Sequence, residues 1–256
     1  LLGAGRPLDP SVDGAATDDA AWTMNEVADA AHEAGGLFCV NHPFAGDLAW
    51  QWWEFDWNKA DGIEIVHALE GTGNNQQLSF WDHLLLSGYR IVGIAGTDSH
   101  HPTEPPHRLG ALVSWVYCDE LSERGVVDGI RRGHVVASYG PRVEFFAESQ
   151  HTRAEMWQRA GLGAPVTLTV QVQHDEPLRV FVLKNGIPFS HDWLTPDAQG
   201  RASYTVTDRP ARACYYRVEL HGDFPGQYDE PPRKRLNQRD YRTLLAATNP
   251  VFAGSL

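Results

Sequence analysis

The sequence lacks long apolar runs and an excess of basic charge. No stretch approaches the ~18 consecutive apolar residues of a membrane span, and residues 1–5 have neither the basic flank nor the apolar length of a secretion signal. Lys and Arg number 21 against 33 Asp and Glu, which gives a formal net charge of −12. Because a nucleic-acid backbone attracts a basic surface, we predict no nucleic-acid partner. Because no apolar run is long enough to span a membrane, we also predict no membrane partner. The sequence assigns neither a compartment nor an oligomeric state.

Cysteine is scarce, and two common catalytic motifs are absent. Cys39, Cys118 and Cys214 are odd in number and lie in predicted strands, so we expect buried free thiols and no disulfide scaffold. There is no Gly-x-Ser-x-Gly motif and no Gly-x-x-x-x-Gly-Lys-Ser/Thr loop. These absences argue against a serine-hydrolase nucleophile elbow and against a Walker-type phosphate loop.

The first half of the chain alternates between strand and helix patterns. Apolar runs bounded by glycine predict buried strands, and 3.6-residue periodicity predicts helices. The predicted elements are a helix at 22–34, strands at 36–40 and 62–66, a helix at 76–87, strands at 91–95 and 111–117, a helix at 122–132 and a strand at 134–138. This alternation predicts a parallel sheet with right-handed crossovers, open or closed into a barrel.

The second half has a different pattern. Residues 166–173 alternate strictly between apolar and polar side chains, and residues 214–220 do so again. Residues 178–183 form a third predicted strand, which ends in the turn signal Lys184-Asn185-Gly186. Strands with no helix between them predict a β-sandwich. We therefore expect two domains, an α/β domain over 1–146 and a β-sandwich over 147–256, with the boundary between Phe146 and Gly163.

Two short polar motifs follow predicted buried strands. They are Asn41-His42-Pro43 and Gly96-Thr97-Asp98-Ser99-His100. Because the carboxyl ends of parallel strands share one edge, and residues i and i+2 of an extended segment face the same way, His42, Asp98 and His100 can converge. Carboxylate and imidazole are ligands of Zn, Mn and Fe. The alternative is that Asp98 caps a turn and both histidines are polar loop residues.

Glu64 stands out because it lies inside an apolar strand. A carboxylate avoids such a position unless it is paired or coordinates a metal. We predict that it faces the same site as a metal ligand. The alternative is an ion pair with Lys59 or Arg90.

Further candidates come from neighbouring loops. Arg142 follows the last strand of the first half and could hold an anionic substrate, or else form an interdomain salt bridge. His107 is a second candidate substrate-binding residue, whereas His67 and His101 are weaker candidates as ligands. The aromatic residues in 50–57 could line a substrate pocket or fill a core.

Taken in order, these motifs resemble a known family. They are Gly35-Gly36, Asn41-His42-Pro43, Gly62-Ile63-Glu64-Ile65, Gly96-Thr97-Asp98-Ser99-His100, Arg132-Gly133-His134-Val135-Val136-Ala137-Ser138 with Gly140-Pro141, and Ala247-Thr248-Asn249-Pro250-Val251-Phe252. Their order and spacing resemble the PHP superfamily of metal-dependent hydrolases, and most closely its CehA/McbA, or carbaryl-hydrolase-like, branch. The resemblance covers nearly the whole chain.

The resemblance implies a fold and a reaction. The fold is a distorted seven-stranded β/α barrel with two or three divalent metal ions at the carboxyl edge of its strands. A metal-bound hydroxide attacks a phosphoester, or in this branch a carbamate ester or amide, of a small-molecule substrate. By this resemblance His42, Asp98 and His100 are each ligands of a different metal.

The chain departs from the family pattern in one respect. The opening His-x-His pair, further Asp and His ligands and a bridging Glu would lie upstream of residue 1, and no His-x-His occurs in the chain. The chain begins with Leu1, so we expect the natural protein to begin upstream and this chain to hold the C-terminal portion of the barrel and the sandwich. It then lacks some metal ligands.

Two alternatives stay open. One is a catalytically inactive binding or interaction module, built on a remnant of the barrel and on the sandwich. The other is a mononuclear metallohydrolase that uses His42, Asp98 and His100 with one of Glu64, His67 or His101.

Overall fold

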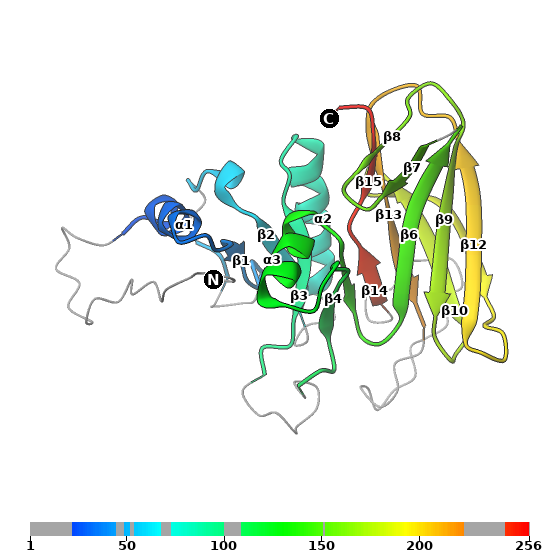
Figure 1. Ribbon diagram of the computed structural model, residues 1–256, viewed down its shortest axis with the longest axis horizontal. Helices are drawn as coiled ribbons and strands as arrows, with labels where there is room; N and C mark the ends of the chain where they lie inside the picture. The colour runs from blue at the N-terminus through cyan, green and yellow to red at the C-terminus, as the bar shows by residue number, and fades with distance from the viewer. Residues whose placement is uncertain are drawn as a thin grey trace.

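A computed structural model describes residues 22–44, 49–51, 54–67, 73–99, 109–150, 152–222 and 244–255. In these ranges the chain is a mixed α/β protein in which strands predominate, with three α-helices that all lie before residue 132 (Figure 1). None of the helices in the described ranges is long and apolar enough to cross a membrane.

A small parallel sheet forms the first layer. Its strands lie in the order β1 (Cys39–Val40), β2 (Gly62–His67) and β3 (Val92–Gly96), and both pairings are parallel. The connecting elements are η2 (Trp57–Lys59) and α2 (Gly73–Leu86), and α1 (Met24–Glu33) precedes the sheet. Thr23 and Glu26 close a capping box at the start of α1, as expected for a helix entered from an exposed loop. The predicted strand–helix alternation is confirmed in this layer.

The next two strands contradict the predicted parallel sheet. β4 (Val113–Val116) and β5 (Val135–Ser138) are joined through α3 (Glu123–Arg131), yet they pair antiparallel. β14 (Leu244–Thr248) occupies the other edge of β5, so both strands belong to a sheet of the C-terminal half. Hydrophobic periodicity predicts a strand but carries no information about its neighbours. In the described ranges the strands close no barrel.

The remaining strands form two facing sheets. They are β6 (Arg142–Ser149), β7 (Thr152–Glu155), β8 (Arg159–Ala160), β9 (Val166–Gln173), β10 (Leu178–Lys184), β11 (Ile187–Leu194), β12 (Arg201–Asp208), β13 (Cys214–His221) and β15 (Val251–Ala253). One sheet has the order β12-β9-β6-β7, and the other has the main path β11-β10-β13-β14-β5-β4, with β15 and β8 attached beside β13. The predicted division after residue 146 falls inside β6, and the existence of two separate domains stays a prediction.

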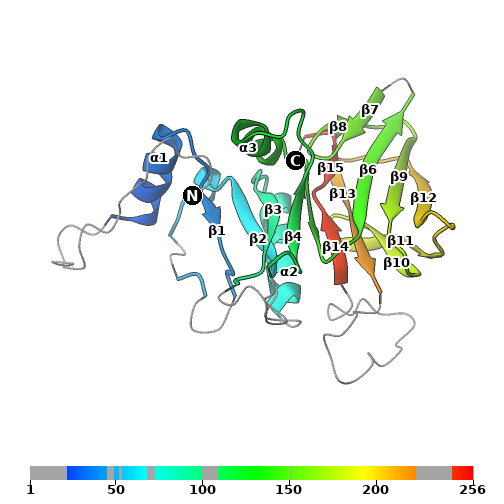
Figure 2. The same cartoon turned by 60° about the horizontal axis from the view of Figure 1, so that its bottom comes forward.

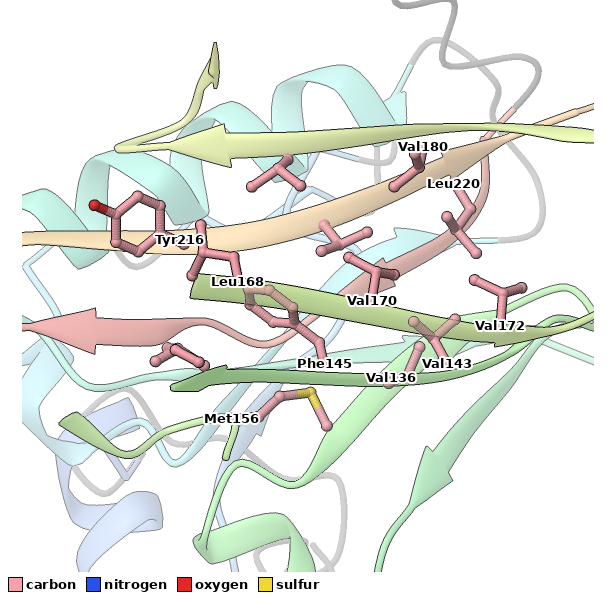
Figure 3. Close-up of a cluster of buried hydrophobic side chains, with 14 of the residues drawn as sticks. Val136, Val143, Phe145, Met156, Leu168, Val170, Val172, Val180, Tyr216 and Leu220 are labelled. Carbon is pink, nitrogen blue, oxygen red and sulfur yellow. The ribbon is translucent and has the colours of Figure 1, made fainter. Parts of the chain in front are cut away.

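The core between these sheets has the alternating pattern that the sequence predicts. Val166, Leu168 and Val170 of β9 are fully buried and pack with Val180 of β10 and Leu220 of β13 (Figure 3). The chain reverses between β10 and β11 through Asn185 and Gly186, which both have positive φ, as a two-residue hairpin turn requires.

A buried ionic cluster joins the parallel layer to the sandwich. Arg217 of β13 is fully buried and donates to both carboxylate oxygens of Asp82 of α2, at 2.7 and 2.6 Å. It also donates to Glu219 at 2.7 Å, and the Tyr215 hydroxyl donates to Asp82 at 2.7 Å. Burial alone would lower the pKa of Arg217, but the two carboxylates outweigh burial and raise it above its usual value.

The junction between the layers also depends on one amide side chain. Asn249 is fully buried and accepts a hydrogen bond from the Gly93 N–H through Oδ1 at 2.8 Å. Its Nδ2 donates to the carbonyls of Gly93 at 2.8 Å and Val135 at 2.9 Å. Figure 2 shows β3 next to β4 at this junction, and β5 lies between β4 and β14 in the larger sheet. Asn249 therefore bridges β3 to β5 with side-chain hydrogen bonds where no ladder forms.

We predict that Asn249→Ala lowers the free energy of unfolding by at least about 2 kcal/mol, because the N–H and the carbonyl of Gly93 lose their partner and the Val135 carbonyl keeps only the Asn249 N–H. Urea denaturation followed by circular dichroism measures this. The matched control is Asn58→Ala, since Asn58 is exposed and its replacement should change stability by no more than about 0.5 kcal/mol. Equal stabilities of the two variants would contradict the bridging role.

Candidate functional site

The carboxyl edge of the parallel sheet gathers most of the predicted site residues that the structure describes. His42 lies two residues beyond the end of β1, and Asp98 lies two residues beyond the end of β3. Glu64 and His67 belong to β2, which pairs with both of these strands. Polar side chains from three adjacent strands are thereby placed at one edge, where ligands of open α/β sheets bind.

Glu64 is the centre of this cluster. Only 4% of its surface is exposed, and its carboxylate accepts the His42 backbone N–H at Oε2 over 2.5 Å. The other oxygen, Oε1, lies 3.1 Å from His67 Nδ1. The alternative ion pairs are wrong, because Lys59 pairs with Asp29 and the Arg90 guanidinium lies over the Phe252 ring.

The two imidazoles lie close together. The ring centroids of His42 and His67 are 5.5 Å apart and nearly perpendicular. His42 Nδ1 is buried and has no hydrogen-bond partner in the described part of the chain. The backbones of His42 and Asp98 have φ of 28° and 48°, a region that non-glycine residues avoid unless their surroundings impose it.

A β-bulge brings Glu64 and His67 to the same side of β2. Residues three apart in a regular strand point to opposite faces. The pairing of β2 with β3 shifts register between Glu64 and Val66, and this extra residue restores a common face. Gly96 of β3 leaves room beside the carboxylate, because a Cβ there would collide with Glu64 Oε1.

His67 belongs to this cluster, although the sequence makes it only a weaker candidate as a ligand. It is 1% exposed, hydrogen bonds to Glu64, and receives a hydrogen bond from the Tyr139 hydroxyl to its backbone carbonyl at 3.4 Å. Nothing in the pattern of residues 62–67 signals the bulge. The one available signal was a histidine at the end of a buried strand that already contained a carboxylate.

The other predicted site residues lie elsewhere or outside the described residues. His100, His101 and His107 lie outside them, so their roles stay predictions. The structure does not bring Arg142 to this edge: its guanidinium lies 4.8 Å from the centroid of the Trp115 ring. Trp115 is next to Ser114 in β4, and Ser114 faces the opposite way, toward β3.

The aromatic residues in 50–57 fill a core where they are described. Trp50, Phe55 and Trp57 are between 4% and 8% exposed and contact each other edge-on or tilted, with ring centroids 5.5 to 5.9 Å apart. They pack against Phe80 of α2 and the strands of the parallel sheet. The core interpretation is therefore confirmed for these three, whereas Trp52 and Trp53 lie outside the described residues.

As a metal site the described cluster is incomplete. Its imidazole and carboxylate donors suit Zn, Mn or Fe. Among the described residues, however, no three His, Cys, Asp or Glu side chains are grouped so that they could hold an ion. The cluster thus has the donor chemistry of a metal site and a partial set of ligands.

The three cysteines are free thiols, but only Cys214 is buried as expected, whereas Cys39 and Cys118 are partly exposed. Cys39 lies in β1, and its Sγ is within 2.8 Å of the Cβ position that a side chain at Gly62 would occupy. Burial raises the pKa of the Cys39 thiol to about 12, and the nearby Asp61 carboxylate contributes in the same direction. A thiol in this state is a packing group and not a nucleophile.

Comparisons with known proteins place the chain in no family. No family model matches it, and no curated protein matches it. A crystal structure of the CARDB domain of a Pyrococcus furiosus protein, in complex with di-metal ions, aligns with a TM-score of 0.28 at 16% identity over 44% of this chain and 89% of that one. The solution structure of the same domain aligns with a TM-score of 0.25 at 17% identity, over 45% of this chain and 97% of that one.

An engineered protein also aligns, with a TM-score of 0.24 at 13% identity over 90% of this chain and 44% of that one. Likenesses this distant support no argument about fold, site or function.

We predict that Cys39 in the folded chain reacts with a disulfide reagent at pH 8 at least ~100-fold more slowly than in the denatured chain. With a pKa of about 12, only about one thiol in 10,000 is ionised at that pH. The measurement is stopped-flow labelling of a Cys118→Ser/Cys214→Ser variant with and without denaturant. Comparable rates in the two states would show that Cys39 is accessible and ionised.

Proposed function

We propose that this chain carries part of the active site of a metal-dependent hydrolase of the PHP type. In this proposal β1, β2 and β3 are later strands of the family's distorted barrel, and the sandwich follows it. The single observation that carries the proposal is the buried Glu64 carboxylate, which contacts His67 and the backbone of His42 at the carboxyl edge of the parallel sheet.

The donor set supports a divalent cation of the Zn, Mn or Fe type. His42 Nδ1 is a buried imidazole nitrogen with no hydrogen-bond partner in the described ranges, as expected for an atom that faces a ligand. Asp98 lies two residues beyond the end of the adjacent strand, β3, and is the carboxylate residue proposed at the same edge. His42, Asp98 and His100 are the proposed ligands, and ligands beyond them complete the set.

Glu64 has a positioning role in this proposal. Both of its oxygens are engaged, one by the His42 N–H and one by His67 Nδ1. A carboxylate that accepts from Nδ1 fixes the tautomer in which His67 Nε2 carries the lone pair, the usual arrangement behind a metal-ligating histidine. Whether Glu64 also binds a metal directly, as its sequence position predicts, stays part of the proposal.

The proposed reaction is hydrolysis of a phosphoester, or of a carbamate ester or amide, in a small molecule. When bound, the metal lowers the pKa of a water molecule and stabilises charge that develops at the reacting centre. The chain's own contribution is to hold two imidazoles 5.5 Å apart around a buried carboxylate. Glu64 and His67 lie on β2 itself and His42 follows β1 by two residues, so the strands fix most of the geometry of the site.

Metal binding tests the site. We expect the untagged chain to bind Zn²⁺ or Mn²⁺ in isothermal titration calorimetry, and His42→Ala and Glu64→Gln to weaken binding by about 10- to 100-fold. His32→Ala is the matched control, because His32 lies on α1 and contacts Asp61 at the surface. Equal affinity in all variants, or no stoichiometric binding, would contradict the metal site and favour the alternative of an inactive binding module.

Turnover tests the reaction. In metal-loaded protein, Asp98→Ala should reduce kcat by at least ~100-fold toward bis(p-nitrophenyl) phosphate or p-nitrophenyl N-methylcarbamate, because a lost ligand displaces the ion. The control is Asp119→Ala, whose carboxylate is 87% exposed and pairs with Arg132. Activity that survives both Asp98→Ala and chelator would refute the assignment.

A further inference from the structure

A second surface feature lies on the sandwich, apart from the carboxyl edge of the parallel sheet. A groove of about 800 Å³ is lined on one side by β4 and on the other by the ends of β6, β9 and β12. Trp115 and Val116 of β4 line the first side, together with Tyr117, which directly follows the strand. Because Trp115 and Ser114 point to opposite faces of β4, and Ser114 bonds to β3, the groove is separated from the Glu64 cluster by β4 itself.

The sheet side of the groove is built from two rows of outward-facing polar side chains. In the first row Gln173 of β9 is paired with Arg142 of β6 and Arg201 of β12. In the second row Gln171 is paired with Glu144 and Ser203. All six side chains are exposed. They present donors and acceptors along a line that crosses three strands.

The floor near β4 is aromatic and has an unused donor. Trp115 is half-buried, and the Arg142 guanidinium lies 4.8 Å from its ring centroid. The Trp115 Nε1–H is buried and has no acceptor in the described ranges. An indole nitrogen can only donate, so none of the described residues completes this hydrogen bond. A ligand oxygen that displaces the exposed Arg142 side chain would supply the acceptor.

The charges in the groove balance. Its lining has two cations, Arg142 and Arg201, and two anions, Glu144 and Asp197. Arg201 already contacts Asp197 at 3.2 Å. A groove built for a phosphate or a polyanion would carry a net positive charge. The glutamine amides and the Ser203 hydroxyl instead match a ligand that has many hydroxyl groups and no net charge.

We propose that this groove binds a neutral carbohydrate chain. A pyranose ring has an apolar C–H face that packs on an aromatic ring, and its hydroxyls both donate and accept hydrogen bonds. Trp115 supplies the aromatic surface, and Gln171, Gln173 and Ser203 supply polar partners along the groove. The site does not depend on metal chemistry at the Glu64 cluster.

The test is isothermal titration calorimetry of the full chain with cellohexaose, xylohexaose and mannohexaose, and with hexagalacturonate as the charged counterpart. We expect at least one neutral hexasaccharide to bind, with an affinity that stays within about twofold between 0.05 and 0.5 M NaCl. Trp115→Ala and Gln173→Ala should each weaken binding by about tenfold or more.

One control variant and one exposed test variant keep the outcome decisive. Trp193→Ala removes a tryptophan that is 56% exposed on β11, and it should leave affinity within about twofold of the unchanged chain. Gln173→Ala changes an exposed side chain, so it tests the groove even if Trp115→Ala fails to fold. No binding of any neutral probe, equal binding in Gln173→Ala, or salt-sensitive binding of hexagalacturonate alone would overturn the proposal.

Discussion

The arrangement of the described part of the molecule depends on β3 as the edge strand of the parallel sheet. In the described ranges β3 pairs with β2 along one edge only, so its other edge has backbone groups that need partners. The Asn249 side chain hydrogen bonds to both the N–H and the carbonyl of Gly93. The Ser114 hydroxyl does the same for Ala95, at 2.9 Å to the N–H and 3.2 Å to the carbonyl. Two side chains thus take the place of the backbone hydrogen bonds that a neighbouring strand would make to β3. They allow a parallel and an antiparallel sheet to meet without sharing a register.

Charged groups reinforce the same junction. Arg217 is buried between Asp82 and Glu219, and removing one partner of such a group would leave an uncompensated buried charge. This makes the contact between α2 and β13 specific, because no shifted packing would pair all three groups. The groove and the Glu64 cluster lie on opposite sides of β4, so this fixed junction also sets their separation.

Local sequence patterns predicted where strands and helices lie, but they predicted poorly which strands pair with each other. The alternation in residues 166–173 matches β9 residue for residue, and the buried Glu64 correctly marked a polar cluster. Periodicity could not show that β5 pairs with β14, because that choice depends on a strand about a hundred residues away. The bulge after Glu64 and the bridging by Asn249 were equally invisible, since both depend on tertiary contacts.

The hydrogen bonds from Asn249 to β3 have a consequence for biosynthesis. A ribosome adds roughly 5 to 20 residues per second, and Asn249 follows Gly93 by 156 positions. At these rates Gly93 of β3 is synthesised roughly 8 to 30 s before its partner Asn249. Throughout that interval the nascent chain exposes an unpaired strand edge, the kind of surface on which chaperones and aggregation both act. The Asn249 side chain thus protects the edge of a strand that is synthesised 156 residues earlier.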